Sequence, residues 1–324
     1  MRPHAVSRRA ATALLASSLI PLARAADPSY PSRSITMIVP FAAGNVTDAI
    51  ARLLADRLSA SLGQAVVVEN KPGASGGIGM AAISRAQPDG YTVGLCAIGP
   101  LALNPALYSK LAYDPINGVM PVSVVYKGPM LILVHASSPW KTLKDLVEAS
   151  QQNSLDFASP GAGSSQHLTA ELFKRASGAK LNHVPNRGSG QAATLLLGKH
   201  VPVLFEVTTV GVPYVKQGQM RALAISSAER LPALPDVPTV REAGYPVTTE
   251  GWLCLIAPAG LPEPLLQRLS EETSKIMRLP DVQAQVANLG GFATSLSSSQ
   301  SASYVQAEIK RWGELIRSLN IKLD

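Results

Sequence analysis

The sequence predicts an α/β fold of about two domains, each a mostly parallel sheet flanked by helices. Short runs rich in β-branched residues alternate with amphipathic stretches along the chain, which is typical of βα units. The length of 324 residues corresponds to about two domains at roughly 150 residues each. Hydrophobic residues make up 46% of the chain and charged residues 16%, so the composition excludes a disordered chain and supplies a large core.

Each expected strand is a short apolar run, and several are followed by a helix. The strands are predicted at residues 35–39, 65–69, 91–96, 131–135, 155–158, 181–184, 203–206, 222–225 and 253–257. In residues 48–62 the side chains of Ile50, Leu54, Leu58 and Leu62 recur at helical spacing, which predicts a helix. Further helices are predicted at residues 166–176, 264–277 and 303–319.

The N-terminus has the pattern of a secretory signal peptide, predicted over residues 1–25. Arg8 and Arg9 precede a small, apolar stretch at residues 10–22, and Ala23-Arg24-Ala25 matches the A-x-A cleavage pattern. We therefore expect a soluble protein that is exported by either the Sec or the Tat route. Its signal peptide is expected to be cleaved near Ala25/Ala26. No later run reaches the ~18 apolar residues of a membrane helix, so no membrane-spanning segment is expected.

The charge of the chain gives no support to nucleic-acid binding. The formal net charge is +7, but four of the 29 basic residues precede Ala26 with no acid among them. The remaining chain has 25 bases against 22 acids, a net charge of +3, and it contains no block of Lys or Arg. Aromatic residues make up only 5%, which leaves few platforms for stacking bases. We expect no nucleic-acid partner.

The histidines and cysteines predict neither a metal nor a cofactor. His135, His167, His183 and His200 show none of the spacings typical of metal ligands. His135 and His183 end predicted strands and are expected to form local hydrogen bonds, whereas His167 either donates to an anion or covers a helix start. Cys96 and Cys254 lie in apolar runs, and the sequence leaves open whether they are buried thiols or a disulfide.

Twice in the chain a strand ends in a loop of small residues that then opens a helix, at residues 40–48 and 159–167. Thr47 is the expected N-cap of the first helix, and Ser164 or Ser165 that of the second. A helix start offers unpaired N–H groups and a positive dipole end, and glycine lets a ligand approach the backbone. Each loop is therefore a candidate anion site, although Gly-rich βα turns are also ordinary connections.

The candidate ligand-binding residues come from these two loops and from the end of the strand at residues 203–206. They are Pro40, Phe41, Gly44, Asn45, Val46, Thr47, Asp48, Ser159, Gly161, Gly163, Ser164, Ser165, Gln166, His167 and Glu206. Glu206 would suit a ligand with a positive or hydrogen-bond-donating end, or it is a partnered surface acid. No residue is assigned a catalytic role.

A serine hydrolase is the leading alternative, because Gly73-Ala74-Ser75-Gly76-Gly77 matches the G-x-S-x-G pattern after a strand. Pro72 and three glycines crowd Ser75, however, and nothing singles out its triad partners. The overlapping G-x-G-x-x-A pattern at residues 77–82 begins eight residues beyond the strand, too late for a dinucleotide loop. A ligand-sensing partner of a signalling protein is a third possibility, and it would use the same pocket as a receptor.

Several short blocks, in the same order along nearly the whole mature chain, resemble one family. They are YPSR at 30–33, PF at 40–41 with Gly44 and Asp48, VENKPG at 68–73, PDGYT at 88–92, NP at 104–105 with LY at 107–108, YDP at 113–115, GSSQHL at 163–168, HVP at 183–185, LPDVPT at 234–239 and APAG at 257–260. The sequence resembles the Bug family of TctC-like periplasmic solute-binding receptors, which serve tripartite tricarboxylate transporters.

This resemblance implies a periplasmic monomer with the two-lobe, type II periplasmic-binding-protein fold and a ligand cleft between the lobes. Lobe 1 would comprise residues 27–128 and 249–324, and lobe 2 residues 129–248. The family's two ligand loops fall on residues 40–48 and 159–167, the same loops that the helix starts indicate. The implied ligand is a small carboxylate, and the implied partners are the membrane subunits of the transporter.

The sequence also departs from the family pattern at positions that would face the cleft. Asn45 and Val46 stand where the first loop commonly has small residues, and Asn186 replaces a common Tyr. The segment at residues 206–208, Glu-Val-Thr, replaces a frequent Asp-Asn segment. Asn186 is therefore added to the candidate ligand-binding residues, and the identity of the carboxylate stays open.

Overall fold

The computed structural model describes residues 30–323, and from Pro31 onward the chain forms one unit. The predicted signal peptide, with its cleavage near Ala25/Ala26, lies outside the described residues. Within the described part of the chain, no helix is long and apolar enough to cross a membrane.

A mixed sheet of ten strands runs through the described residues, in the order β2-β1-β3-β9-β4-β7-β5-β6, while β8 and β10 also pair with β4. The strands are β1 (Ile35–Val39), β2 (Val66–Asn70), β3 (Thr92–Ala97), β4 (Val119–His135), β5 (Leu155–Ser159), β6 (Leu181–Pro185), β7 (Val203–Val207), β8 (Met220–Ile225), β9 (Glu250–Pro258) and β10 (Phe292–Ala293). Strand β1 pairs in parallel with β2 and β3, and β5 pairs in parallel with β6 and β7. The pairings of β4 and β9 are antiparallel, so the two parallel parts are separated by antiparallel strands.

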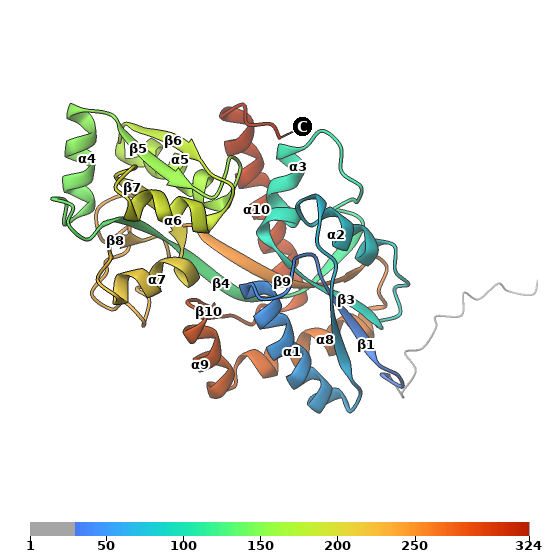
Figure 1. The fold of residues 1–324 in the computed structure, drawn as a ribbon. Coiled ribbons are helices and arrows are strands. Elements are labelled where there is room, and N and C mark those ends of the chain that lie inside the picture. Colours follow the sequence, from blue (N-terminus) through green and yellow to red (C-terminus); the bar gives the residue numbers. More distant parts are fainter. Residues whose placement is uncertain (1–29, 324) are drawn as a thin grey trace, which may run out of the picture. The chain divides into compact units, whose positions relative to one another are not determined.

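Strand β4 changes its partners along its length. Residues 119–129 pair with β9, and residues 130–135 pair with β7 and β8. Figure 1 shows β4 in green and β9 in orange running side by side through the centre of the fold. The division into two lobes at residues 128/129 and 248/249 stays a prediction.

Helices flank the sheet, which confirms the predicted α/β class. They are α1 (Val46–Leu62), α2 (Gly77–Ser84), α3 (Asn104–Leu107), α4 (Leu143–Gln152), α5 (Ser165–Ser177), α6 (Ser189–Leu197), α7 (Thr208–Lys216), α8 (Glu263–Met277), α9 (Pro280–Asn288) and α10 (Ser298–Ser318), together with the 3₁₀ turn η1 (Ala74–Gly76) and the π turn η2 (Gly99–Leu103). Helices α1 and α2 pack near β1–β3, α5–α7 pack on β5, β7 and β8, and α10 contacts β4.

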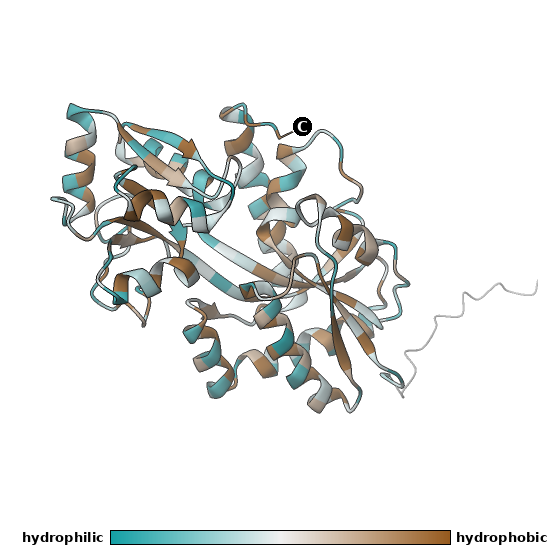
Figure 2. Ribbon diagram, viewed as in Figure 1, coloured by the Kyte–Doolittle hydropathy of each residue, from teal (hydrophilic) through white to brown (hydrophobic). Residues whose placement is uncertain are grey.

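Alternate residues of β4 lie on opposite faces of the sheet and belong to two different hydrophobic clusters. In β4, Ile132 and Val134 join a cluster with helices α4 and α5, whereas Leu131 and Leu133 join a second cluster with α6. This period of two means that both faces of the β4–β7 part are covered and apolar. Figure 2 shows brown, apolar residues along the strands, while the peripheral helices carry both colours.

The two cysteines are brought together by the sheet although 158 residues separate them. Cys96 in β3 and Cys254 in β9 are register partners on adjacent antiparallel strands, and both are free, fully buried thiols. Burial raises the pKa of the Cys254 thiol to about 12 and raises that of Cys96 as well. Both thiols are therefore unreactive while the protein stays folded.

The packing of α2 against the end of β1 allows no side chain at Gly79, and we expect Gly79→Ala to destabilise the protein by about 1–3 kcal/mol. A Cβ at this position would lie 2.7 Å from the Cα of Pro40 and 3.0 Å from the carbonyl oxygen of Lys71. Both are backbone atoms, so neither yields easily. Urea unfolding measures the change.

Gly190→Ala in α6 is the matched control, because a Cβ there would meet nothing within 4 Å. Alanine is the better helix former, so this variant should be neutral or slightly stabilising. Equal effects of the two substitutions would contradict the close contact at Gly79.

Candidate functional site

The first candidate loop, residues 40–48, ends where Asn45 caps α1. The Asn45 side chain accepts a hydrogen bond from the amide of Asp48 at 3.0 Å, and α1 begins at Val46. The prediction of Thr47 as the N-cap was wrong: Thr47 lies inside the first turn and is buried. Asn45 takes this role because its short side chain reaches the third amide of the helix.

Asp48 organises the first loop from within. Its Oδ2 accepts from the amide of Gly44 at 3.0 Å and its Oδ1 accepts from Asn70 at 3.0 Å, while Arg52 pairs with Oδ1 at 3.0 Å. Burial by itself would raise the pKa of Asp48, but hydrogen bonds from Arg52, Gly44 and Asn70 outweigh it and lower the pKa to about 2. Asp48 is thus negatively charged at physiological pH, and it already accepts the hydrogen bond of the Gly44 amide. The neighbouring Phe41 carbonyl accepts from Asn70 at 3.1 Å, and Pro40 is buried.

The second candidate loop, residues 159–167, is stabilised by Ser164 and two stacked histidines. Ser164 caps α5 by accepting from the amide of His167 at 3.2 Å, which confirms one of the two predicted caps. The His167 and His183 rings stack with centroids 3.8 Å apart. His167 Nδ1 accepts from the Gly163 amide at 3.1 Å, and His183 Nε2 lies 2.7 Å from Ser159 Oγ.

The contacts of the histidines test the roles that the sequence predicted for them. His135 contacts Ser137 at 2.9 Å, as predicted for a local bond, but the prediction for His183 was wrong, because Ser159 lies 24 residues away. His167 covers the helix start. Burial lowers the pKa of both His167 and His183 to about 4, so both rings are neutral at physiological pH.

Gln166 and Glu206 form a buried polar pair beside the second loop. Gln166 Nε2 donates to Glu206 Oε1 at 2.9 Å, and the Val207 amide donates to the same oxygen at 2.8 Å. Oε2 of Glu206 is buried and has no hydrogen-bond partner among residues 30–323. Burial raises the pKa of the Glu206 carboxyl above its usual value, although these hydrogen bonds oppose the shift. The reading of Glu206 as a surface acid was wrong, because the residue is fully buried.

Asn186 also lies against the second loop. Its Nδ2 donates to the carbonyl oxygen of Ser159 at 3.2 Å and to that of Val184 at 2.9 Å. A Cβ on Gly161 would lie 3.2 Å from the carbonyl oxygen of Asn186. The structure therefore brings Asn186 and Glu206, which lie 27 and 40 residues from their partners Ser159 and Gln166, to the second loop.

Each helix start retains amides without an acceptor. In the described part of the chain, the amides of Asn45, Val46 and Thr47 in the first loop donate no hydrogen bond, and neither do those of Ala162, Ser165 and Gln166 in the second. The Gly44, Gly161 and Gly163 amides are already used inside the protein. The residues just before and within the first helical turns, rather than the glycines, thus offer the donors for an anion.

The two loops are linked through residues 75–108. A Cβ on Gly76 would lie 3.5 Å from Cβ of Pro40 in the first loop. Ser75 Oγ lies 2.8 Å from the hydroxyl of Tyr108, and the neighbouring Leu107 would lie 2.9 Å from a Cβ on Gly163 in the second loop. Both loops therefore touch one connecting segment.

Ser75 has no catalytic partner in the described residues. Its side-chain hydroxyl is hydrogen-bonded to Tyr108, and its carbonyl oxygen accepts from Asn104 at 3.0 Å. No histidine or acid is hydrogen-bonded to it within the part of the chain that the structure describes. The serine-hydrolase alternative therefore gains no support. Among the same residues, no group of three or more His, Cys, Asp or Glu side chains is placed to hold a metal ion.

Comparison with known proteins identifies relatives along almost the whole chain. The family model described as the tripartite tricarboxylate transporter family receptor, TctC, matches residues 50–321. The protein BugT of Bordetella pertussis is 34% identical over 299 residues, which are 91% of this chain and 92% of BugT.

Two solved structures from Rhodopseudomonas palustris share the fold. Rpa4515 with adipate is 32% identical with a TM-score of 0.79, over 91% of this chain and 100% of Rpa4515. MatC with bound malate is 32% identical with a TM-score of 0.73, over 89% of this chain and 100% of MatC. No support for a hydrolase comes from any of these relatives.

Proposed function

Because the chain belongs to the TctC family of tripartite tricarboxylate transporter receptors, we propose that it captures a small carboxylated solute outside the cytoplasm. In this proposal the protein is exported to the periplasm and acts as a monomer. It binds the solute without converting it and delivers it to separate membrane subunits of the transporter.

The observation that carries the proposal is the pair of helix starts with unused amides, at α1 and α5. Such amides, together with the helix dipole, suit a carboxylate. Two relatives of similar fold hold the dicarboxylates adipate and malate, which supports this ligand class. A hydrogen bond to a charged group contributes about 1.5–3 kcal/mol, so roughly four reach the ~8 kcal/mol of micromolar binding before ordering costs.

In the proposed receptor the two loops lie on different lobes, whose boundaries are residues 128/129 and 248/249. The change of partners along β4 and its pairing with β9 support these boundaries. A solute that contacts both loops binds the closed arrangement better than the open one, and this difference in affinity drives closure.

Glu206 and Asn186 are proposed to select among carboxylates. The free oxygen of Glu206 is either an acceptor for a donor group of the solute or, when the raised pKa leaves the carboxyl protonated, a donor to it. Asn186 uses its amide nitrogen inside the protein, and no donor to its side-chain oxygen lies among residues 30–323. A solute with a hydroxyl or amine beside its carboxylate would use both acceptors.

We expect Ser165→Asp to lower carboxylate affinity at least tenfold while leaving the fold intact. The new carboxylate would lie at the first position of α5, beside the amides proposed to hold the solute, and the dipole there favours an acid. We prefer Ser165 to Gly163 for this substitution, because a side chain at Gly163 would itself disturb the fold. There φ is +72° and a Cβ would lie 2.9 Å from the side chain of Leu107. A thermal-shift panel of mono-, di- and tricarboxylates, amino acids and aromatic acids measures binding through the rise in melting temperature.

Ser165→Asn is the matched control, since it has the same shape without the charge, and it should retain most of the affinity. A panel in which no carboxylate raises the melting temperature of the wild-type protein would contradict the proposed function. Equal affinity of the Asp and Asn variants would contradict the site.

A further inference from the structure

A cavity of about 570 Å³ lies between the C-terminal half of α5, residues 241–248 and α10, and none of its lining residues belongs to either candidate loop. Three arginines line it: Arg175 from α5, Arg241 and, from α10, Arg311. Leu172 and Val247 give it an apolar surface between the cations. We call it the arginine cavity.

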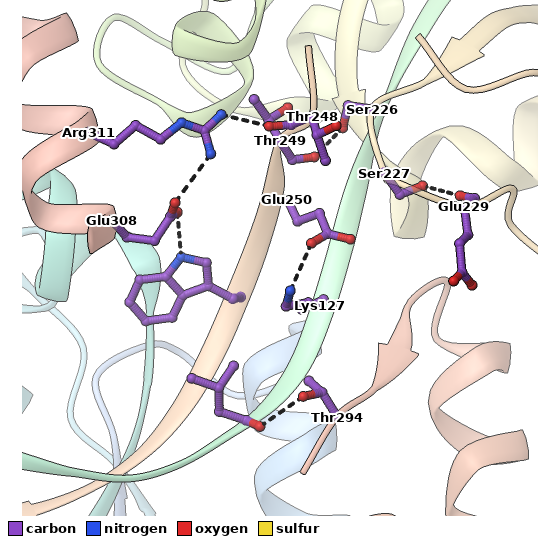
Figure 3. Close-up of polar contacts among 12 residues, drawn as sticks. Lys127, Ser226, Ser227, Glu229, Thr248, Thr249, Glu250, Thr294, Glu308 and Arg311 are labelled. Carbon is purple, nitrogen blue, oxygen red and sulfur yellow. Dashed lines mark hydrogen bonds and ion pairs between the residues drawn. The ribbon is translucent and has the colours of Figure 1, made fainter. Parts of the chain in front are cut away.

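Arg311 is held in place at the edge of the arginine cavity. It donates to the carbonyl oxygen of Thr248 at 2.6 Å and pairs with Glu308 at 3.3 Å, and its guanidinium lies 4.9 Å from the centre of the Trp312 ring. Figure 3 shows Arg311 reaching from α10 to Thr248, with Glu308 below it. A positioned guanidinium loses little conformational freedom when a ligand binds.

Neither of the other two arginines forms an ion pair with any residue from 30 to 323. Arg175 donates to the hydroxyl of Ser318 at 2.6 Å, which is a neutral acceptor. Arg241 is exposed, and its guanidinium makes no hydrogen bond or ion pair with any residue from 30 to 323. The acid next to it, Glu242, is already paired with Arg230 at 2.9 Å. Among the described residues, the lining of the cavity therefore holds three arginines and no acid, and only Arg311 is paired, with Glu308.

Glu308 offsets the charge of Arg311 alone, so one carboxylate does not neutralise the three guanidinium groups of the cavity. It is only 6% exposed, and its Oε2 accepts from the indoles of Trp252 at 3.0 Å and Trp312 at 2.8 Å. Only Oε1 meets Arg311. An excess of positive charge therefore faces the solvent in the arginine cavity.

We propose that the arginine cavity binds a small organic anion with two or three carboxylates, as a site separate from the candidate loops. Guanidinium forks match carboxylates in a bidentate geometry, and Leu172 and Val247 would contact the carbon skeleton between them. The volume lies in the range of small-molecule sites. The anion at this site need not be the transported solute, so this inference goes beyond the proposed function.

Such an anion would connect two parts of the fold. Helix α5 packs on β7, whereas α10 packs on β4 and the η2–α3 segment. A ligand bound by Arg175 and Arg311 together would therefore tie α5 to α10. It would protect both helices, and the segment at residues 241–248, from hydrogen exchange.

Citrate is the probe for the test, with binding measured by isothermal titration calorimetry and located by hydrogen-exchange mass spectrometry. We expect citrate to protect residues 241–248 and the facing ends of α5 and α10. Arg241→Gln should weaken this binding about tenfold or more without loss of fold, because Arg241 has no partner to lose among residues 30–323. Arg175→Gln should weaken it as well.

Arg268→Gln on α8 is the matched control, since Arg268 is exposed and does not line the cavity. The same citrate measurements are repeated with each variant in the Ser165→Asp background, which blocks the candidate loops. Citrate binding that persists in this background comes from the arginine cavity, so a failure of the proposed function and a failure of the arginine cavity give different results. Absence of protection at residues 241–248, or equal weakening by Arg241→Gln and Arg268→Gln, would overturn the proposal. Inorganic phosphate that binds as tightly as citrate would overturn the organic ligand class.

Discussion

Glu308→Ala is expected to lower the free energy of unfolding by about 3–5 kcal/mol, one of the two largest effects we predict. The Glu308 carboxylate joins strand β9 to helix α10, because it accepts from Trp252 at 3.0 Å and from Trp312 at 2.8 Å. Both indoles are 1% exposed, so removal of the carboxylate leaves two buried N–H groups without an acceptor. Arg311 loses its ion pair at the same time.

Urea unfolding followed by tryptophan fluorescence measures this change directly. Glu314→Ala is the matched control on the same helix, since Glu314 is exposed and its loss should change stability by less than about 0.5 kcal/mol. A Glu308→Ala protein as stable as the Glu314→Ala protein would show that the indoles do not depend on the carboxylate.

The second large effect is a loss of stability in acid, caused by the stacked histidines. Burial lowers the pKa of His167 and His183 from 6.5 to about 4, and the charge of one ring further disfavours charging His183. Lys174 acts in the same direction on both rings, while Glu171, whose Oε1 lies 3.8 Å from His167 Nε2, opposes the shift of His183. Phe157 packs on His183 with centroids 4.9 Å apart, so the stack has an apolar side.

The direction of the pH dependence of stability follows from the number of protons that each state binds. Between pH 6.5 and about 4 the unfolded chain binds protons at these histidines and the folded protein does not, so stability falls as the pH falls through this window. Above pH 6.5 both states are neutral there and the effect vanishes. The loss is on the order of a few kcal/mol for the pair. A protonated His167 Nδ1 could not accept from the Gly163 amide, so the second loop should be the first part affected.

The measurement is the free energy of unfolding from pH 8 to pH 4 for the wild-type protein and for His183→Phe. The phenyl ring retains the stack but cannot titrate, so the slope below pH 6.5 should become shallower. His200→Gln, which removes an exposed histidine, serves as the control and should leave the slope almost unchanged. Identical slopes for His183→Phe and the wild-type protein would refute the assignment.

The sequence predicted the strands well where a run is apolar and uninterrupted. The limits of β1 were correct, whereas only residues 131–135 of β4 were expected and its first part was missed. The first part of β4 contains residues that usually interrupt a strand, namely Pro121, Gly128 and Pro129. In the structure Pro121 lies beside a register shift, and Gly128 and Pro129 come just before β4 changes its partners. An antiparallel strand tolerates such residues at irregular positions. The short helices, such as α7 with its internal Pro213, were missed for a similar reason.

The candidate loops were predictable because their signals are local: a strand, small residues and a capping side chain within ten residues. Which amides are free was not predictable, because the Gly163 amide is taken by His167 and the Gly44 amide by Asp48. The Gln166–Glu206 and Ser159–His183 contacts join residues from different strands and helices. Such pairs depend on the register of the sheet, which a single sequence does not specify.

The late position of β9 in the chain limits the order in which the sheet can form when the chain emerges from its N-terminus. Pro129 and Glu250 are register partners, so residues 130–249 emerge from the ribosome between two strands that finally lie side by side. The second half of β4 with β5–β8 can complete its ladder before Glu250 is made, because all of its strands are contiguous in the chain. Strand β3 and the first half of β4 must both wait for β9, and until then each has an unpaired edge that is open to mispairing.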